Sequence, residues 1–174
     1  IDEGWIDYIL PQTYWAINHT SASFSTLSEW WSWCVRNKDC NLYLGQGVYM
    51  AIEYTPTATG SYKYWGDPDE IKNQIFNMDS HKEVDGASMY KYSSLLSSNS
   101  LIKSAVSHLN TYWNKQIPGA VIKSFKDAPA TEVENVILNG STLSWEKVEN
   151  VRQYVVWRVA KNQTVDTKNI EHLY

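Results

Sequence analysis

Three apolar, β-prone runs of this chain are each followed by a segment with helical spacing. The runs cover about residues 5–12, 41–49 and 84–90. The segment after the first run, 25–35, places these apolar residues three and four positions apart: Leu27, Trp30, Trp31 and Cys34. Strands that alternate with helices predict an α/β fold with a parallel sheet and right-handed crossovers.

The second predicted helix opens at Asp67-Pro68-Asp69-Glu70 and extends to about Asp79. Asp67 is a capping residue type, Pro68 fits the first helical position, and the two following acids complement the positive end of the helix dipole. This assigns all three acids a capping role. A third helix is predicted from near Ser94 to Tyr112 or Trp113, with a break around 97–100.

The repeat of strand and helix is slightly longer than that of a minimal eight-fold barrel. The strands start near residues 5, 41 and 84, so the spacing is 36 and then 43 residues, against roughly 30 per unit in the barrel. Three units do not close a barrel. Two alternatives follow: an open three-layer α/β piece, or the last part of a barrel whose earlier strands lie upstream.

The two ends of the chain suggest a piece of a longer protein. It opens at Ile1, four residues before a strand, and closes at Tyr174 soon after a strand signal. A signal peptide or membrane anchor would therefore belong to segments beyond these ends.

The character of the sequence changes after Trp113. A polar stretch with two prolines predicts a linker over 118–132, followed by short strands over 133–138, 141–145 and 153–159. Asn139-Gly140 is typical of a tight turn, because both residues tolerate positive φ. The last two strands resemble strands B and C of a fibronectin type III module, of which the 42 residues 133–174 supply only a part, since a complete sandwich needs about 100.

The aromatic residues are mostly those that carry a hydrogen-bonding tip. The chain has nine Trp and twelve Tyr but only three Phe, which favours polar ligands such as carbohydrate over lipid. A formal net charge of −4 supplies no basic field. Nucleic acid is therefore not an expected partner.

The cysteine and histidine content indicates neither a metal nor a cofactor. The four histidines (His19, His81, His108 and His172) show no ligand spacing. Cys34 and Cys40 lie six apart, at the predicted end of a helix and start of a strand. They form either a disulfide in an exported protein or two unpaired, half-buried thiols.

The end of the first predicted strand gathers residue types that suit a sugar. Pro11 cannot donate to a sheet ladder, so pairing should stop near it. Gln12 then offers both donors and acceptors to a hydroxyl, and Tyr14 and Trp15 offer flat faces with polar tips. The alternative is that these aromatics belong to a core beneath a loop.

Four segments of this chain resemble the C-terminal half of the bacterial glycosyl-hydrolase-like family 10 proteins. They are Trp5-Ile6-Asp7-Tyr8-Ile9-Leu10-Pro11-Gln12-Thr13-Tyr14-Trp15, Trp30-Trp31, Leu42-Tyr43-Leu44-Gly45-Gln46-Gly47-Val48-Tyr49, and Val84-Asp85-Gly86-Ala87-Ser88-Met89-Tyr90. The likeness covers residues 1–115 well and the tail loosely. It implies that 1–117 supply about strands six to eight of a TIM (β/α)8 barrel, joined by the linker to a partial fibronectin-like domain over 133–174.

The resemblance also implies a sugar cleft at the carboxyl ends of these strands. Gln12, Tyr14 and Trp15 line it from one strand, and Gln46 and Tyr49 from the next. Strand alternation puts Leu10 with Gln12 and Leu44 with Gln46, so both glutamines are expected at equivalent heights. The alternative for Gln46 is a buried amide bonded to a neighbouring loop.

Glycoside hydrolysis needs two carboxyl groups, and this chain does not obviously supply them. Asp7 and Asp85 stand near the amino ends of their strands, where hydrogen-bonding or helix-packing roles are expected. Glu53 is the candidate catalytic residue, because it follows the second strand at the correct end. The resemblance places the other acids upstream, so the chain alone is expected to be inactive.

The connection over 50–66 is long for a βα loop, which usually has two to six residues. Its aromatics either form a lid or subsite wall, or merely cover the barrel rim: Tyr54, Tyr62, Tyr64 and Trp65.

These observations and the resemblance together predict part of an exported bacterial glycoside hydrolase, periplasmic, at the cell surface or an outer-membrane lipoprotein. The expected ligand is a polysaccharide, with peptidoglycan glycan as the leading substrate. The alternative is a non-catalytic carbohydrate-binding protein on a degenerate barrel. Open strand edges further predict a partner, either the upstream remainder of the barrel or a second copy.

Overall fold

The computed structural model describes residues 1–114, 121–125, 131–149, 151, 154–166 and 172–174. The chain divides into two units. The first comprises Ile1–Asn114 with Ala120–Phe125, and the second comprises Lys115–Gly119 with Lys126–Tyr174.

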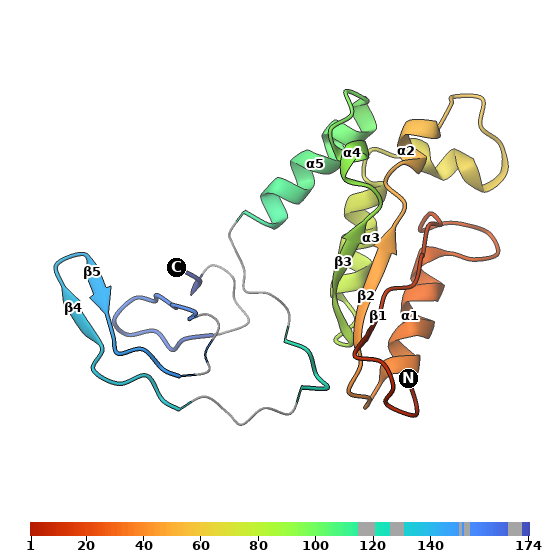
Figure 1. The fold of residues 1–174 in the computed structure, drawn as a ribbon. Coiled ribbons are helices and arrows are strands. Elements are labelled where there is room, and N and C mark those ends of the chain that lie inside the picture. Colours follow the sequence, from red (N-terminus) through yellow and green to blue (C-terminus); the bar gives the residue numbers. More distant parts are fainter. Residues whose placement is uncertain (115–120, 126–130, 150, 152–153, 167–171) are drawn as a thin grey trace. The chain divides into compact units, whose positions relative to one another are not determined.

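A parallel sheet of three strands forms the centre of the first unit (Figure 1). The strands are β1 (Tyr8–Ile9), β2 (Asn41–Gln46) and β3 (Val84–Met89), in the order β1-β2-β3. Both pairings are parallel, which confirms the predicted parallel arrangement. Membership of a barrel remains a prediction.

Strand β1 is shorter than the predicted 5–12 because Pro11 interrupts the ladder. Beyond Ile9 the chain still follows β2: the Gly45 amide donates to Pro11 O at 3.0 Å and the Thr13 amide to Gly45 O at 3.1 Å. Gln12 forms an isolated parallel bridge with Gly45. Since proline has no N–H, Pro11 takes part in this pairing only through its carbonyl oxygen.

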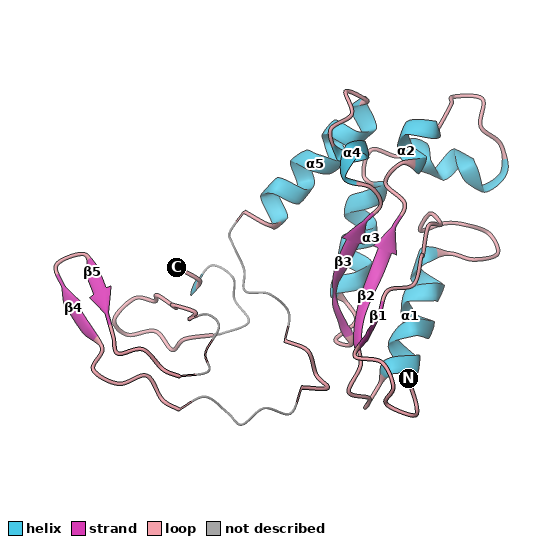
Figure 2. Ribbon diagram, viewed as in Figure 1, coloured by secondary structure: helices cyan, strands magenta, loops and turns pink. Residues whose placement is uncertain are grey.

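In the described part of the first unit, three longer helices and three short ones accompany the strands (Figure 2). The longer helices are α1 (Phe24–Val35), α3 (Glu70–Asp79) and α5 (Ser100–Tyr112). The shorter ones are α2 (Met50–Glu53), the 3-10 helix η1 (Gly60–Gly66) and α4 (Tyr92–Leu95). Two of the short helices, α2 and η1, lie inside the segment expected to be a long loop.

Side-chain caps start two of the long helices and a turn precedes the third. Ser23 Oγ accepts from the Thr26 amide before α1, and Asn99 Oδ1 accepts from the Leu101 amide before α5. Asp67 Oδ1 accepts from the Asp69 amide at 2.9 Å. Because α3 begins only at Glu70, Asp67 lies in the preceding turn and does not occupy the cap position predicted for it.

Helices α1 and α3 pack against one face of the sheet. Their buried apolar side chains meet the same face of β2 in one cluster: Phe24, Val35, Leu42, Leu44, Ile75 and Met78. On the opposite face the rings of Tyr8 and Tyr43 meet edge to face at 6.0 Å. Tyr8 is 56% exposed, so this second face presents aromatic surface to solvent in the described unit.

Residues 121–125 fasten the amino-terminal edge of the sheet. Asn41 donates from Nδ2 to Val121 O and accepts the Lys123 amide, both at 2.9 Å. Asp85 accepts from the Leu42 amide and from Lys123 Nζ, and Asp7 accepts from Ser124 Oγ. The hydrogen-bonding roles expected of Asp7 and Asp85 are thereby confirmed.

The two cysteines are free thiols, as in the second of the two alternatives. Burial raises the pKa of both thiols, which keeps them protonated and weakly nucleophilic.

The second unit contains an antiparallel hairpin of β4 (Ile137–Asn139) and β5 (Thr142–Ser144). The predicted turn is present, although its loop residues are Gly140 and Ser141 because Asn139 still pairs with Thr142. Gly140 has a φ of 61°, which a tight hairpin turn requires. The prediction of a strand over 153–159 was wrong for its described part, 154–159, which forms only an isolated antiparallel bridge between Trp157 and Leu173; residue 153 lies outside the described residues. The fibronectin-like assignment remains a prediction.

Candidate functional site

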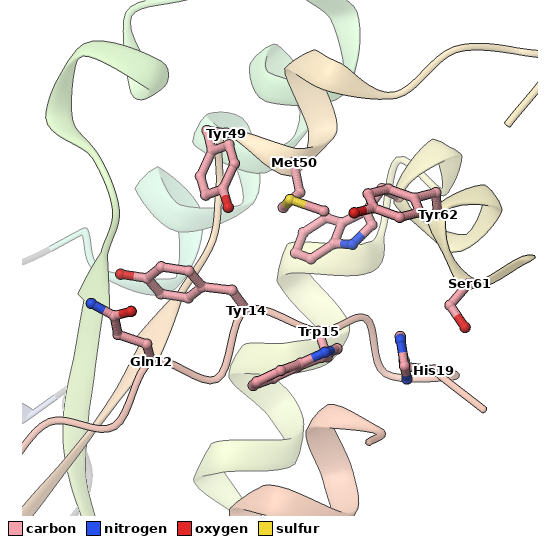
Figure 3. Close-up of a pocket in the computed structure, with 9 residues that line it drawn as sticks. Gln12, Tyr14, Trp15, His19, Tyr49, Met50, Ser61 and Tyr62 are labelled. Carbon is pink, nitrogen blue, oxygen red and sulfur yellow. The ribbon is translucent and has the colours of Figure 1, made fainter. Parts of the chain in front are cut away.

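A pocket of about 290 Å³ opens beside the carboxyl ends of β1 and β2. Figure 3 shows Gln12 and Tyr14 at one end of it and His19 and Ser61 at the other, with Trp15 between them. Among the described residues, the lining consists of Gln12, Tyr14, Trp15, His19, Tyr49, Met50, Ser61, Tyr62 and Trp65. Four of the five predicted substrate-binding residues are therefore brought together in one cavity.

One tyrosine follows each strand of the sheet, and the three rings meet. Tyr14 stacks on Tyr90 with ring centroids 5.6 Å apart. Tyr49 contacts both rings edge-on, at 6.1 Å and 5.9 Å. Tyr90 was not among the predicted site residues, although it stands directly after the third strand as the others stand after the first two. The trio forms an aromatic platform next to the pocket.

The phenol groups of Tyr14 and Tyr49 stay neutral. Burial raises the pKa of Tyr14, helped by the nearby Tyr90 and Tyr49 rings. Burial also raises the pKa of Tyr49, with a further contribution from the Glu53 charge. A neutral phenol both donates and accepts one hydrogen bond, which suits a sugar hydroxyl better than a phenolate would.

Gln46 is not part of the pocket. The register pairs Gln12 with Gly45, so Gln12 and Gln46 are offset by one position, and a one-residue offset reverses the face of a strand. Gln46 accordingly lies on the helix side, fully buried, and donates from Nε2 to Gln74 Oε1 of α3 at 3.1 Å. The expectation that both glutamines emerge together was wrong, and the buried-amide alternative holds, with a helix as the partner.

Glu70 is a buried carboxyl group that bonds the segment after β1, beyond the capping role predicted for it. It is 3% exposed and accepts from the Ile17 amide at 2.7 Å and from Gln74 Nε2 at 2.8 Å. Burial raises its pKa, an effect that these two hydrogen bonds oppose and the charge of Asp67 reinforces.

We expect the stability of the protein to depend on the ionisation of Glu70. Because the folded-state pKa lies above the unperturbed 4.5, the contribution of this carboxyl is complete below pH 4.5 and falls as pH rises through the folded value. Glu70→Gln should therefore gain stability relative to the natural protein as pH rises from about 4 to 7.5. Urea unfolding across that range measures the difference; a constant difference, or one of opposite slope, would contradict the expectation.

Glu53, the candidate catalytic acid, is exposed at the end of α2 and is absent from the pocket lining. Its charge nevertheless acts on Tyr49. The lining residues that the structure describes include no carboxylate. The described cavity can thus hold and orient a ligand, whereas proton transfer by a carboxyl group requires a residue from outside its lining.

The aromatics of the 50–66 segment divide between the pocket and the core. Tyr62 is an exposed wall of the pocket, and Trp65 is a buried residue at its base. Tyr64 packs against the core cluster that includes Trp65, and the Tyr54 ring lies directly over Gly66. Thr20 contacts Ser61 through its hydroxyl at 3.2 Å, so this segment also meets the chain that follows β1.

Two further properties concern only the described residues. No group of three or more His, Cys, Asp or Glu side chains gathers there in a way that would hold a metal ion. Within the same part of the chain, no helix combines the length and apolar character needed to cross a membrane.

Comparison with known proteins finds similarity to glycosyl hydrolases. Glycosyl hydrolase YngK of Bacillus subtilis (strain 168) is 41% identical over 76 residues, which is 43% of this chain. Glycosyl hydrolase DigH of Escherichia coli (strain K12) is 28% identical over 113 residues, which is 65% of this chain. No protein-family model matches.

The chain is therefore similar to part of two proteins named glycosyl hydrolases. The matched segments span only 14% of YngK and 25% of DigH.

Proposed function

We propose that this chain forms one wall of the sugar-binding cleft of a glycoside hydrolase. The observation that carries the proposal is the convergence of Gln12, Tyr14, Trp15 and Tyr49 on one pocket at the carboxyl edge of a parallel sheet. An amide and neutral phenols bond sugar hydroxyls, and the aromatic faces cover the C–H face of a pyranose. The names of the similar proteins support the same class.

The fold we propose is about the last three βα units of a TIM (β/α)8 barrel. Parallel strands in chain order, with α1 and α3 on one face, support it, and barrel active sites lie at the carboxyl edge. The exposed face with Tyr8 and Tyr43 would then be barrel interior, closed by upstream strands of a longer protein. The second unit would begin a fibronectin-like domain.

The reaction we propose is hydrolysis of a glycosidic bond by two carboxyl groups, one acting as acid and the other as nucleophile or base. In the part of the chain that the structure describes, the pocket lining supplies neither group. Residues upstream would supply the acids, while Glu53 remains the candidate within the chain, close enough to act on Tyr49. We propose an exported protein that acts on a polysaccharide, with the glycan of bacterial peptidoglycan as the leading substrate.

One observation favours a second function. Because no carboxylate is among the described residues that line the pocket, a barrel that has also lost its upstream acids would bind polysaccharide without cutting it. Folds are often reused in this way.

A digest of purified peptidoglycan, intact and stripped of peptides, tests the proposal. We expect the longer protein that contains this chain to release soluble sugars, detected by mass spectrometry, and the 174-residue chain alone to bind the glycan without release. Retention by both proteins without any release would favour the binding function. Neither retention nor release from either form of peptidoglycan would overturn the cell-wall proposal.

A further inference from the structure

The segment that links β1 to α1 carries four residues of the pocket, and three of them lie within residues 13–19. We call residues 13–19 the site loop; it contains Tyr14, Trp15 and His19. Trp15 is 39% exposed, so packing of its ring does not by itself fix its position. The backbone of the site loop must therefore be held by other contacts if these side chains are to keep their places.

Two side chains of α3 hold the backbone of the site loop, and a side chain of β2 supports one of them. Glu70 accepts the Ile17 amide at 2.7 Å, and Gln74 Nε2 donates to Trp15 O at 3.3 Å. Gln74 Nε2 also donates to Glu70 at 2.8 Å, and Gln46 Nε2 donates to Gln74 Oε1 at 3.1 Å. We call Gln46, Glu70 and Gln74 the polar brace; it joins β2, α3 and the site loop.

The geometry of the polar brace determines which way each amide faces. A carbonyl oxygen only accepts, so Trp15 O requires the Nε2 side of Gln74 to face it. Oε1 of Gln74 must then point toward Gln46, which presents its own Nε2. The Ile17 amide only donates, so it fixes Glu70 as an acceptor. Each member of the brace thus constrains the next.

Burial makes these hydrogen bonds hard to replace. Gln46 and Gln74 are fully buried and Glu70 is 3% exposed, so a broken bond would leave a polar atom without water. A separate contact fixes the start of the loop, because Thr13 Oγ1 donates to Gly45 O at 2.7 Å. The site loop is therefore anchored at residue 13 and again at residues 15 and 17, on both sides of the Tyr14 and Trp15 side chains.

We propose that Glu70 and Gln74, supported by Gln46, are positioning residues that hold Tyr14 and Trp15 in their ligand-binding arrangement. The inference rests on the proposed function in one respect, namely that these two rings contact sugar. It assigns a role to a carboxyl group that never reaches the pocket. It also explains why two polar side chains of α3 point into an otherwise apolar interface.

Hydrogen exchange measured residue by residue tests the brace without any ligand. In Glu70→Ala we expect the Ile17 amide to exchange at least about tenfold faster while the Leu44 amide of β2 keeps its rate. Glu70→Gln retains an acceptor oxygen and should preserve the protection of Ile17. Met78→Ala is the matched control, because it removes a buried side chain of the same helix that packs elsewhere, in the cluster with Leu42.

Unchanged exchange at Ile17 in Glu70→Ala would overturn the proposal. So would equal acceleration of Ile17 and Leu44, as a general loss of stability would produce in both Glu70→Ala and Met78→Ala.

Binding of peptide-free glycan strands supplies the second readout. We expect affinity about tenfold weaker in Glu70→Ala and restored in Glu70→Gln, since small displacements of binding groups carry large costs. Faster Ile17 exchange with unchanged affinity would overturn the positioning role. If the natural chain does not bind the strands at all, the proposed function fails, and the exchange experiment alone decides whether the brace exists.

Discussion

Replacing Gly45 by alanine is expected to lower the free energy of unfolding by about 3 kcal/mol, the upper end of the cost of overpacking a tight interior. A Cβ atom there would lie 2.8 Å from Pro11 O and 3.3 Å from the Tyr14 ring. The first of these atoms is backbone, and it already accepts the Gly45 amide at 3.0 Å. Strand β2 and the chain after β1 must therefore move apart, and this displaces Tyr14. Urea unfolding measures the loss.

Gly86→Ala on the neighbouring strand is the matched control. A Cβ atom at Gly86 would meet only the Tyr43 ring, at 3.1 Å, and a side chain gives way more easily than backbone does. Alanine also lowers the conformational entropy of the unfolded chain, which stabilises the folded protein by about 0.4–1 kcal/mol. The free energy of unfolding of the Gly86 variant should therefore be nearly unchanged. Equal losses in the two variants would show that close approach of β1 to β2 is not the cause.

Removal of the Trp15 ring should weaken glycan binding about 30-fold. A fully buried aromatic side chain removes about 150–250 Å² from water. If the bound sugar covers roughly half of that area on Trp15, the contact contributes on the order of 2 kcal/mol to the binding free energy, which is about 30-fold in Kd. The ring lines the pocket and is already 39% exposed, so Trp15→Ala should leave the fold nearly intact. Calorimetric titration of peptide-free glycan strands into the natural and variant proteins measures the change in Kd.

Trp33→Ala controls for the general loss of a tryptophan. Trp33 is 67% exposed on α1 and lines a separate groove together with Trp30 and Trp31. Its replacement should not alter affinity for the glycan strands. An equal loss of affinity in both variants, or none in Trp15→Ala, would contradict the assignment of the sugar site to the pocket.

The regular elements of the first unit could be predicted because their periodicity is strong. Helix α1 begins one residue from the predicted start and ends at the predicted Val35, and β2 and β3 begin at the predicted residues. Strand β1 was the exception, since only Tyr8–Ile9 form a strand where 5–12 was predicted. The length of β1 depends on its pairing with β2. Contacts between distant segments cannot be predicted from the residues of β1 alone.

The residue types of the candidate site could be predicted more easily than the strand register that decides which of these residues face it. Residues after a strand end were identified by chemistry, and Gln12, Tyr14, Trp15 and Tyr49 do meet. Gln46 was misplaced because its face depends on a one-position offset between two strands that only the folded pairing reveals.

The polar brace left a signal that was available in the sequence. Glu70 and Gln74 are four residues apart and share a helix face with the buried Ile71, Ile75 and Met78. A polar pair on an apolar stripe needs buried partners, although the sequence alone does not name the loop that provides them. A capping explanation for Glu70 was sufficient locally and so concealed its second role.

The hydrogen bonds made by residues 121–125 determine where the first unit can be truncated. A chain shortened to end with helix α5 would retain every strand of the three-stranded sheet. It would lose the Lys123 ammonium group, which lies 2.7 Å from Asp85. It would also lose the two backbone groups that bond the Asn41 side chain. Proteolysis is then expected to stop at a core fragment that still includes Phe125. These contacts, and not the end of a helix, set the carboxyl-terminal boundary of the first unit, and a fusion partner belongs beyond that point.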